Sequence, residues 1–252
     1  MKLLLYLSFL GTDYCGYQIQ PNGVTVQQKL NEATRALFGY DCDIVGCSRT
    51  DSGVHANQFC VTVAEKGKNT LSSTIPVDRI PLAMAQFLPD DISVLSAELV
   101  SEEFHSRYDV KYKEYVYRIW NCPHRNPFLT DRAWHYPRQI TEEQLARMNS
   151  AAKAFLGTWD FAAYMAADSK VKDTVRSVYE AEVTRQGDII EFRVCANGFL
   201  YHMVRILTGT LIAVAEGKID PEDIQAITKS KDRRQAGITV PACGLYLNRV
   251  VY

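Results

Sequence analysis

The sequence predicts an α+β fold in which two similar halves share a largely antiparallel central sheet flanked by helices. The first half reads as strand, helix, strand, helix and strand, and the second half is looser but similar. Runs that favour hairpins are mixed with helices that fit crossovers, a combination typical of α+β layers. A chain of 252 residues is long enough for one large domain or for two small ones packed together.

The first half of the chain shows regular periodicity and one clear helix start. The apolar run 2–10 predicts a buried first strand, because no small-x-small cleavage site follows it as in a signal peptide. Thr25 with Gln28 three residues later fits a capping box, so a helix is predicted from there to about Phe38. The other elements predicted for this half are strands at 43–47, 59–63 and 92–100 and a helix at 76–88.

The second half begins with a strand whose residues alternate in character. Tyr115 and Tyr117 are spaced by two, as on one face of a half-buried strand. Thr141 and Gln144 repeat the capping-box spacing, and that helix is predicted to end near Gly157. The remaining predicted elements are strands at 177–184, 189–195 and 245–251, a long helix at 199–216 closed by Gly217, and a helix that begins at Pro221.

Charge and cysteine content narrow the class of protein. The 28 basic and 29 acidic residues nearly cancel, so an RNA-binding surface would have to gather its basic residues on one face. The seven cysteines are an odd number without a C-x-x-C pair, which argues against a disulfide framework and a structural zinc site and favours a reducing compartment. No apolar stretch reaches the ~18 residues of a membrane span. A cytoplasmic enzyme or binding protein is expected.

The segment 48–55, Ser-Arg-Thr-Asp-Ser-Gly-Val-His, is the most informative stretch of the chain. A carboxylate on a tight loop between strands can be presented at the edge of a sheet, and Arg49 beside Asp51 favours its charged form. An ionised, oriented carboxylate can act as a nucleophile or as a base. The same residues also fit an ordinary polar turn with a solvated arginine, because such turns are common.

This loop resembles the [G/S]-R-T-D-x-G-V-H-A signature of the tRNA pseudouridine synthase A family. Further stretches resemble motifs of the same family, in order across nearly the whole chain. They are 11–20, similar to G-T-x-[YF]-x-G-W-Q-x-Q; 25–27, similar to T-V-Q; 104–117, similar to F-H-x-R followed by Y-x-Y; 160–161, similar to D-F; 197–205, similar to N-x-F-L-x-x-M-V-R; and 241–247, similar to P-A-x-G-L-x-L. Two positions depart from the pattern: Tyr17 stands where the family usually has Trp, and Ser48 where many members have Gly.

The resemblance implies a pseudouridine synthase fold and an isomerase that acts without a cofactor or a metal ion. Its substrate would be uridine at positions 38, 39 and 40 of the tRNA anticodon stem-loop, and it would be a cytoplasmic homodimer in which each tRNA touches both subunits. Residues 1–110 would form the half with the catalytic loop, and residues 111–252 the half that completes the active-site cleft. Two prolines within 121–127 mark the best hinge in the chain.

The resemblance also implies roles for single residues. Asp51 would be the essential aspartate; whether it bonds to the sugar, bonds to the base or only abstracts a proton stays open. Tyr115 would stack on the target base and is a candidate to move a proton, and Arg205 would pair with the carboxylate. The expected substrate-binding residues are Arg49, which would help to extrude the base, Leu245, as the apolar floor of the pocket, and His55, Arg107 and Tyr117.

Two groups of basic residues are further candidates for RNA contact. The stretch 107–125 interleaves arginines and lysines with tyrosines, which suits an RNA backbone, although a solvated strand face would look similar. Lys170, Lys172 and Arg176 lie in a loop-like segment and could form a second phosphate contact.

Three other functions remain open at this point. A non-catalytic RNA-binding protein would keep the basic and aromatic strand but would not need Asp51 together with Arg49, Tyr115 and Arg205. An aspartate-based hydrolase of small molecules would usually call for a metal cluster or a phosphate loop, and the sequence contains neither motif. A related pseudouridine synthase with a different RNA target is possible as well, because a fold does not fix its substrate.

Overall fold

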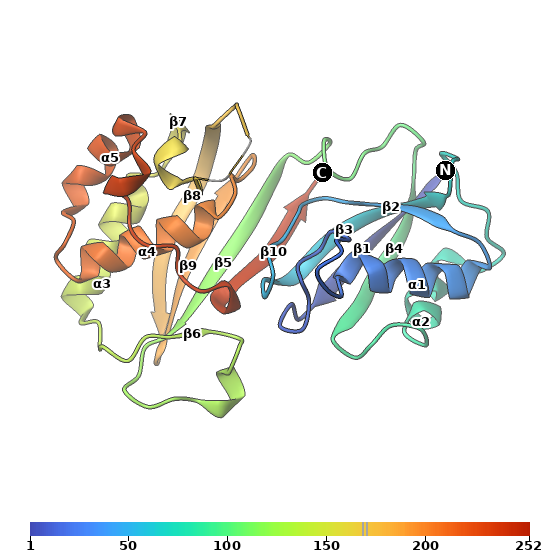
Figure 1. Cartoon of the computed structure of the whole chain (residues 1–252), viewed down its shortest axis with the longest axis horizontal. Helices are drawn as coiled ribbons and strands as arrows, with labels where there is room; N and C mark the ends of the chain where they lie inside the picture. Colours follow the sequence, from blue (N-terminus) through green and yellow to red (C-terminus); the bar gives the residue numbers. More distant parts are fainter. Residues whose placement is uncertain (168, 170) are drawn as a thin grey trace. The chain divides into compact units, whose positions relative to one another are not determined.

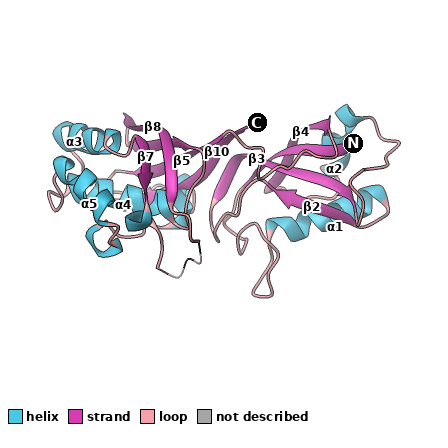
Figure 2. Cartoon of the chain, turned by 90° about the horizontal axis from the view of Figure 1, so that it is seen from above, coloured by secondary structure: helices cyan, strands magenta, loops and turns pink. Residues whose placement is uncertain are grey.

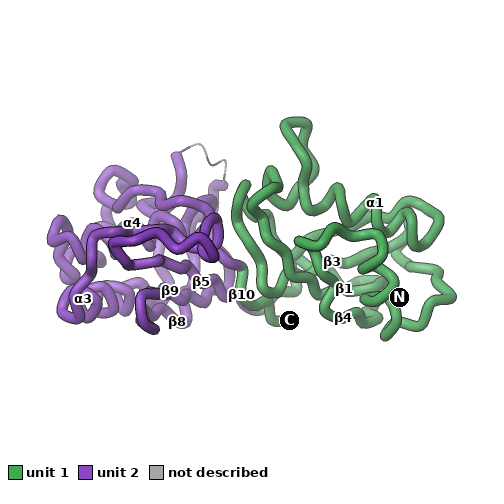
Figure 3. The backbone as a smooth tube through the Cα atoms, turned by 90° about the horizontal axis from the view of Figure 1, so that it is seen from below, with its two compact units in different colours: residues 1–111, 247–252 green, residues 112–246 purple. Residues whose placement is uncertain are grey.

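The computed structural model describes all residues except 168 and 170. The second of these is a lysine for which a phosphate contact is predicted, and it lies outside the described part. The described residues form two compact units (Figure 3), one of Met1–Lys111 with Leu247–Tyr252 and one of Tyr112–Tyr246. In both units mostly antiparallel strands combine with helices, which confirms the predicted α+β class.

In the first unit, the strands are arranged around the first one. β1 (Lys2–Phe9) lies between β4 (Ile92–Val100) and β3 (His55–Glu65), and β2 (Cys42–Gly46) pairs with the C-terminal part of β3; these pairings are antiparallel. The last strand, β10 (Leu245–Val251), lies next to β3 through the residues that belong to this unit. The helical elements are α1 (Val26–Phe38), the 3-10 turn η1 (Val77–Arg79) and α2 (Ile80–Met84), and α1 and α2 lie next to each other (Figure 1).

Helix α1 has the predicted bounds, and its caps explain them. Thr25 Oγ1 accepts a hydrogen bond from the Gln28 N–H at 3.2 Å, and Gly39, at φ 79°, closes the helix. The Gln28 side chain donates to Glu32 at 2.9 Å, so that only half of the predicted capping box forms. The buried residues recur every three or four positions and are Val26, Leu30, Ala33 and Thr34.

The second unit is built on an antiparallel sheet in the order β5, β9, β8 and β7. Figure 2 shows the strands in magenta and the helices in cyan. Its strands are β5 (Tyr112–Trp120), β6 (Trp134–His135, parallel to β5), β7 (Gly157–Asp160), β8 (Val175–Gln186) and β9 (Ile189–Ala196). Its helices are α3 (Glu142–Lys153), α4 (Met203–Ala215) and α5 (Ile224–Ser230), and its 3-10 turns are η2 (Pro127–Leu129), η3 (Ala162–Tyr164), η4 (Pro221–Asp223), η5 (Arg233–Gln235) and η6 (Ala242–Gly244). Helix α3 packs against α4 and β8.

Aromatic rings fill the core of each unit. In the first unit the Phe59 ring packs against Phe9 and Tyr17, with ring centroids 5.5 and 4.5 Å apart. In the second unit Tyr164 packs edge-on against Phe155, with ring centroids 5.4 Å apart.

Among the described residues, no helix combines the length and the apolar character needed to cross a membrane.

Two predicted helices differ from the structure because of single residues. The helix expected at 76–88 is a 3-10 turn followed by α2, because Pro81 has no N–H and fits the first turn of a helix rather than its interior. The capping box at Thr141 is complete, as predicted. However, α3 already ends at Lys153, and Gly157, at φ 103°, opens β7 instead of capping the helix.

The predicted helix at 199–216 begins later than expected. His202 has a left-handed backbone, with φ 60°, which does not fit a right-handed helix, so that α4 starts at Met203. Eleven of the thirteen residues of α4 are buried. A helix that is buried on nearly all sides is an internal one, so α4 is the central helix of its unit.

Candidate functional site

The loop that carries Asp51 connects β2 to β3. Arg49 is exposed, Thr50 is buried and Asp51 is half-buried. The loop turns tightly after the aspartate, where the Val54 N–H donates to the Asp51 carbonyl oxygen at 3.2 Å and Gly53 adopts φ 78°. This left-handed position favours glycine, and the turn fixes the backbone of Asp51.

Hydrogen bonds tie this loop to the segment that follows β1. The Gly11 N–H donates to His55 Nδ1 at 2.9 Å, and the Ser52 hydroxyl donates to the Tyr14 carbonyl oxygen at 3.1 Å. The Tyr14 hydroxyl in turn donates to the Asp91 carboxylate at 2.6 Å. The segment therefore joins the loop to the body of the first unit.

Two glycines let this segment approach the loop closely. A Cβ on Gly11 would overlap the Val54 carbonyl oxygen, and a Cβ on Gly16 would lie 2.5 Å from the Thr50 carbonyl oxygen. Gly16 also has φ 78°, which L side chains rarely adopt. The stretch that resembles G-T-x-[YF]-x-G thus forms a cradle under the loop of Asp51.

His55, a predicted substrate-binding residue, is fully buried at the start of β3. Its Nδ1 accepts the hydrogen bond from Gly11, so that the imidazole holds the cradle and the loop together. This place supports a positioning role for His55. Direct contact with RNA stays a prediction.

Gln27 in α1 gives the cradle a second support. Its Nε2 donates to the Ile44 carbonyl oxygen at 2.9 Å, and its Oε1 accepts from the Ile19 N–H at 3.1 Å. The Gln27 backbone N–H donates to the Tyr17 carbonyl oxygen at 2.9 Å. The stretch that resembles T-V-Q therefore connects α1, β2 and the cradle through one side chain.

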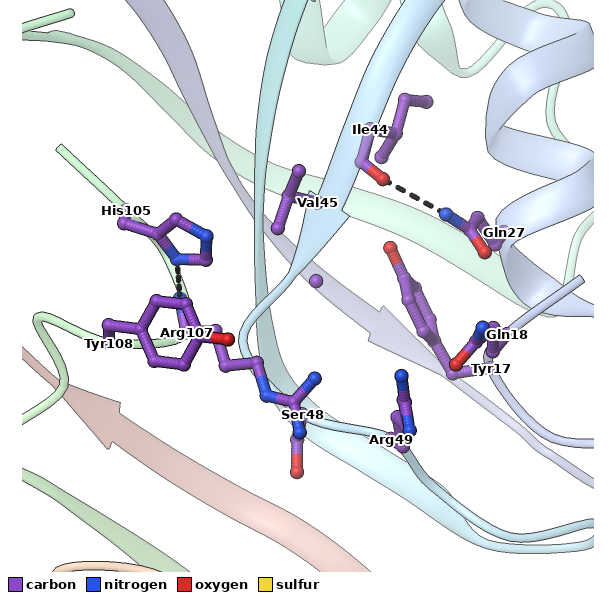
Figure 4. A pocket seen from close by; sticks show the side chains of 11 residues that line it. Tyr17, Gln18, Gln27, Ile44, Val45, Ser48, Arg49, His105, Arg107 and Tyr108 are labelled. Carbon is purple, nitrogen blue, oxygen red and sulfur yellow. Dashed lines mark hydrogen bonds between the residues drawn. The ribbon is translucent and has the colours of Figure 1, made fainter. Parts of the chain in front are cut away.

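A pocket of about 210 Å³ opens beside the loop, within the first unit (Figure 4). Arg49 and Arg107, two of the predicted substrate-binding residues, both line it, and Ser48 lies between them in the view. Tyr17 belongs to its wall, and Tyr108 is exposed at its edge. The structure thus brings two arginines from separate segments to one concave surface. One of them, Arg49, is two residues before Asp51 in the sequence.

Tyr17, which replaces the usual Trp of the resembled motif, packs tightly but leaves its hydroxyl unpaired. A Cβ on Gly46 would lie 2.5 Å from the Tyr17 ring, so that only glycine fits there. The hydroxyl oxygen is buried and has no hydrogen-bond partner among the described residues. A buried donor without a partner costs about 1–3 kcal/mol. Burial also raises the pKa of Tyr17, so the hydroxyl stays neutral.

Replacing Tyr17 by phenylalanine is expected to raise the free energy of unfolding by about 1 kcal/mol, because the ring stays and the unpaired hydroxyl is removed. Urea unfolding of the two proteins measures the change. Tyr6→Phe is the matched control: its hydroxyl donates to Glu98 at 2.7 Å, and its removal should lower stability by about 1 kcal/mol. A loss of stability in Tyr17→Phe would show that the hydroxyl has a partner.

The second unit carries predicted site residues on β5. Tyr115 is buried, and Phe199 packs edge-on against its ring, with centroids 4.9 Å apart and an interplanar angle of 81°. Tyr117 is fully buried, and its hydroxyl donates to the Pro241 carbonyl oxygen at 2.7 Å. Burial raises the pKa of Tyr117, so the hydroxyl keeps the proton that it donates. Tyr117 is well placed to fix the segment that follows α5, and contact with substrate stays a prediction.

Arg205 lies in the first turn of α4 and is held by a backbone segment. Its Nε donates to the Val240 carbonyl oxygen at 2.8 Å, and the Val240 N–H donates back to the Arg205 carbonyl oxygen at 3.5 Å. The same segment crosses α4 at Gly209, where a Cβ would overlap the Ile238 carbonyl oxygen. The Nε hydrogen bond to Val240 holds the Arg205 guanidinium at this segment.

Leu245, the predicted floor of the pocket, is buried at the start of β10. The residue before it, Gly244, approaches β5 so closely that a Cβ would lie 2.6 Å from the Arg118 carbonyl oxygen. Tyr117 and Arg205 therefore both contact the segment 240–245 of the second unit, to which Leu245 belongs. Arg49, Asp51, His55 and Arg107 belong to the first unit, on the loop of Asp51 and on the pocket beside it.

Comparisons with known proteins point to one family. Residues 151–252 match the family model described as tRNA pseudouridine synthase. The chain is 42% identical to tRNA pseudouridine synthase A of Thermoanaerobacter sp. (strain X514), over 100% of this chain and 99% of that protein. It is 41% identical to the proteins of the same name from Caldicellulosiruptor bescii and Bacillus pumilus, again over 100% of this chain and 99% of each relative.

Proposed function

We propose, since this chain belongs to the tRNA pseudouridine synthase A family, that it isomerises uridine to pseudouridine at positions 38, 39 and 40 of the tRNA anticodon stem-loop. The observation that supports this most is the loop of Asp51. Its residues match the family signature, and the cradle of Gly11 and Gly16 holds them in a defined turn with a half-buried carboxylate. A non-catalytic RNA-binding protein would not need this arrangement.

In the proposed reaction Asp51 supplies the carboxylate that acts on the nucleotide. The uracil detaches from the ribose, turns and rejoins it through carbon instead of nitrogen, so that the product is an isomer of the substrate. Arg205 provides a positive charge that keeps a carboxylate ionised in a partly buried place. Arg49 helps to extrude the target base, which costs on the order of a few kcal/mol in unstacking and unpairing.

Tyr115 is proposed to stack on the extruded uracil and to move a proton. Its phenol is part of a rigid wall, because Phe199 packs edge-on against the ring. Tyr115→Phe keeps the ring and is expected to lower kcat about 10²-fold or more, the usual contribution of a proton-transfer group. Single-turnover kinetics with an unmodified tRNA transcript measures the effect, and an unchanged thermal midpoint shows that the fold survives. A wild-type rate would remove the proton-transfer role and leave the stacking role.

The test of the proposed function is direct mapping of the product. The protein is incubated with an unmodified tRNA transcript that carries uridine at positions 38, 39 and 40, and pseudouridine is located at single-nucleotide resolution. We expect product at those positions. Product only at other uridines would make this chain a synthase with a different target, and no product with any tRNA would overturn the proposal.

We also propose that the enzyme is a homodimer that works in the cytoplasm. A chain with a net charge of -1 gains a long basic binding surface when two copies join their basic faces. A tRNA substrate supports the cytoplasmic location. Light scattering after size-exclusion chromatography should give twice the mass of the 28.5 kDa chain, whereas the mass of one chain at micromolar concentration would contradict the dimer.

A further inference from the structure

The pocket beside the loop of Asp51, which we name the arginine pocket, is lined by Tyr17, Ser48, Arg49, His105, Arg107 and Tyr108 together with neighbouring backbone. Arg49 and Arg107 are both exposed, and among the described residues neither guanidinium has a carboxylate partner. Of the described residues that line the pocket, none is acidic. In a chain of net charge -1, two unneutralised arginines at one concave surface favour an anionic ligand.

The wall of the pocket that carries Arg107 is held in place by hydrogen bonds within the protein. The Ser106 hydroxyl donates to the Val45 carbonyl oxygen at 2.6 Å, and the Tyr252 hydroxyl donates to the Ser106 carbonyl oxygen at 2.8 Å. The Arg107 N–H donates to His105 Nδ1 at 3.1 Å, as Figure 4 shows. The Asp109 carboxylate is near this turn, but it accepts the His105 N–H at 2.8 Å. The segment is therefore anchored to β2 and to the C-terminal residue.

An aromatic platform accompanies the two arginines. The Tyr108 side chain is 75% exposed, and the His105 ring packs against it with centroids 4.3 Å apart. The Arg107 guanidinium lies 6.0 Å from the centroid of the Tyr108 ring. A large exposed ring that packs on a second ring and has a cation beside it is a typical stacking surface for a nucleobase.

We propose that the arginine pocket binds a nucleotide that neighbours the target uridine, with its phosphate between Arg49 and Arg107 and its base on Tyr108. This inference rests on the proposed function. Arg49 and Asp51 are two residues apart, so their Cα atoms lie within about 7 Å. The arginine pocket, which Arg49 lines, therefore lies close along the chain to the residue that acts on the target uridine, and the proposal places the neighbouring nucleotide there.

The expected effects differ for the two parts of the subsite. Arg107→Gln should weaken binding of an anticodon stem-loop and should lower the slope of log affinity against log salt by about one, as for one lost phosphate contact. Tyr108→Ala should weaken binding by roughly 5- to 150-fold without changing that slope, because stacking is not ionic. Arg79→Gln, an exposed arginine that ion-pairs with Asp78 at 3.5 Å, is the matched control and should bind as the wild type does.

Abasic RNA separates stacking from general damage. Stem-loops that lack the base on either side of the target are titrated with the wild type and with Tyr108→Ala. We expect that one of them weakens wild-type binding to the level of Tyr108→Ala and leaves the variant unaffected. Two results would overturn the subsite. One is that Tyr108→Ala lowers the affinity, relative to the wild type, by the same factor for intact and for both abasic stem-loops. The other is that Arg107→Gln and Tyr108→Ala both keep the affinity and the salt slope of the wild type.

The outcome also distinguishes this inference from the proposed function. Normal product formation with fully unaffected RNA binding by Arg107→Gln and Tyr108→Ala would reject the subsite and keep the synthase. Absence of product from the wild type together with the expected binding losses would reject the synthase and keep a nucleotide subsite. A wild-type protein that binds no stem-loop would reject both.

Discussion

Replacing Asp51 by asparagine is expected to abolish pseudouridine formation, with kcat reduced by about 10⁴-fold or more, the scale on which loss of a nucleophile or base acts. Asparagine has nearly the same shape as aspartate but carries no charge and cannot act as a base. The backbone of the loop should stay in place, because hydrogen bonds of its main-chain atoms and of the Ser52 and His55 side chains hold it. Single-turnover rates with excess enzyme provide the measurement.

The control for this prediction is an exposed aspartate of the same unit. Asp90→Asn also removes one negative charge from the first unit and should leave the rate and the affinity for tRNA unchanged, because its side chain is exposed and outside the loop. Asp51→Asn should bind tRNA about as tightly as the wild type. A rate within tenfold of the wild type would mean that the charge of Asp51 is not needed.

The second large effect is expected from substitution of Gly11, a buried residue of the cradle under the loop of Asp51, by alanine. The added Cβ would overlap the Val54 carbonyl oxygen, so that the loop or the cradle has to shift. Displacement of a catalytic group by about 1 Å can cost about 10²-fold in rate. We therefore expect kcat to fall by about 10²-fold while the KM for tRNA changes little.

A matched glycine separates displacement from loss of stability. Gly39→Ala places a side chain at φ 79° in open space, which should cost about 1–2 kcal/mol of stability without touching the loop. Both variants are compared for thermal midpoint and for kcat. If the two lose activity in proportion to their stability, the positioning role of Gly11 is refuted.

Local signals in the sequence were sufficient for much of the fold. The bounds of α1 follow from Thr25 and Gly39, which cap the helix through contacts within a few residues. The last strand, Leu245–Val251, has the predicted bounds. The start of the predicted helix at 76–88 was wrong in a way that Pro81 could have signalled, since proline belongs in a first turn.

Other features depend on tertiary contacts that no local pattern reveals. Gly11 and Gly16 are needed because distant backbone comes close to them, and the sequence shows only that two glycines are present. Gln27 bridges two segments, although it looks like an ordinary polar residue of a helix. The left-handed backbone of His202 delays the start of α4, and the helical periodicity of the sequence does not predict this.

The candidate site divides in the same way. An arginine beside a carboxylate on a tight turn made the segment around Asp51 a candidate for chemistry, and the family resemblance was needed to prefer this over an ordinary polar turn. Only the structure shows what Phe199 and Ser106 do. Phe199 packs on Tyr115, and Ser106 anchors the wall beside Arg107. Both residues lie inside stretches that resemble family motifs, so the resemblance indicated where to look but not what they do.

The central claim is that a single carboxylate, that of Asp51, carries the isomerisation. The most direct measurement is pseudouridine mapping on an unmodified tRNA transcript after prolonged incubation with a molar excess of wild type or of Asp51→Ala. The wild type should convert uridine in the anticodon stem-loop, and Asp51→Ala should bind the same transcript and leave every uridine unchanged. Pseudouridine at the same positions and in the same yield from Asp51→Ala would contradict the claim.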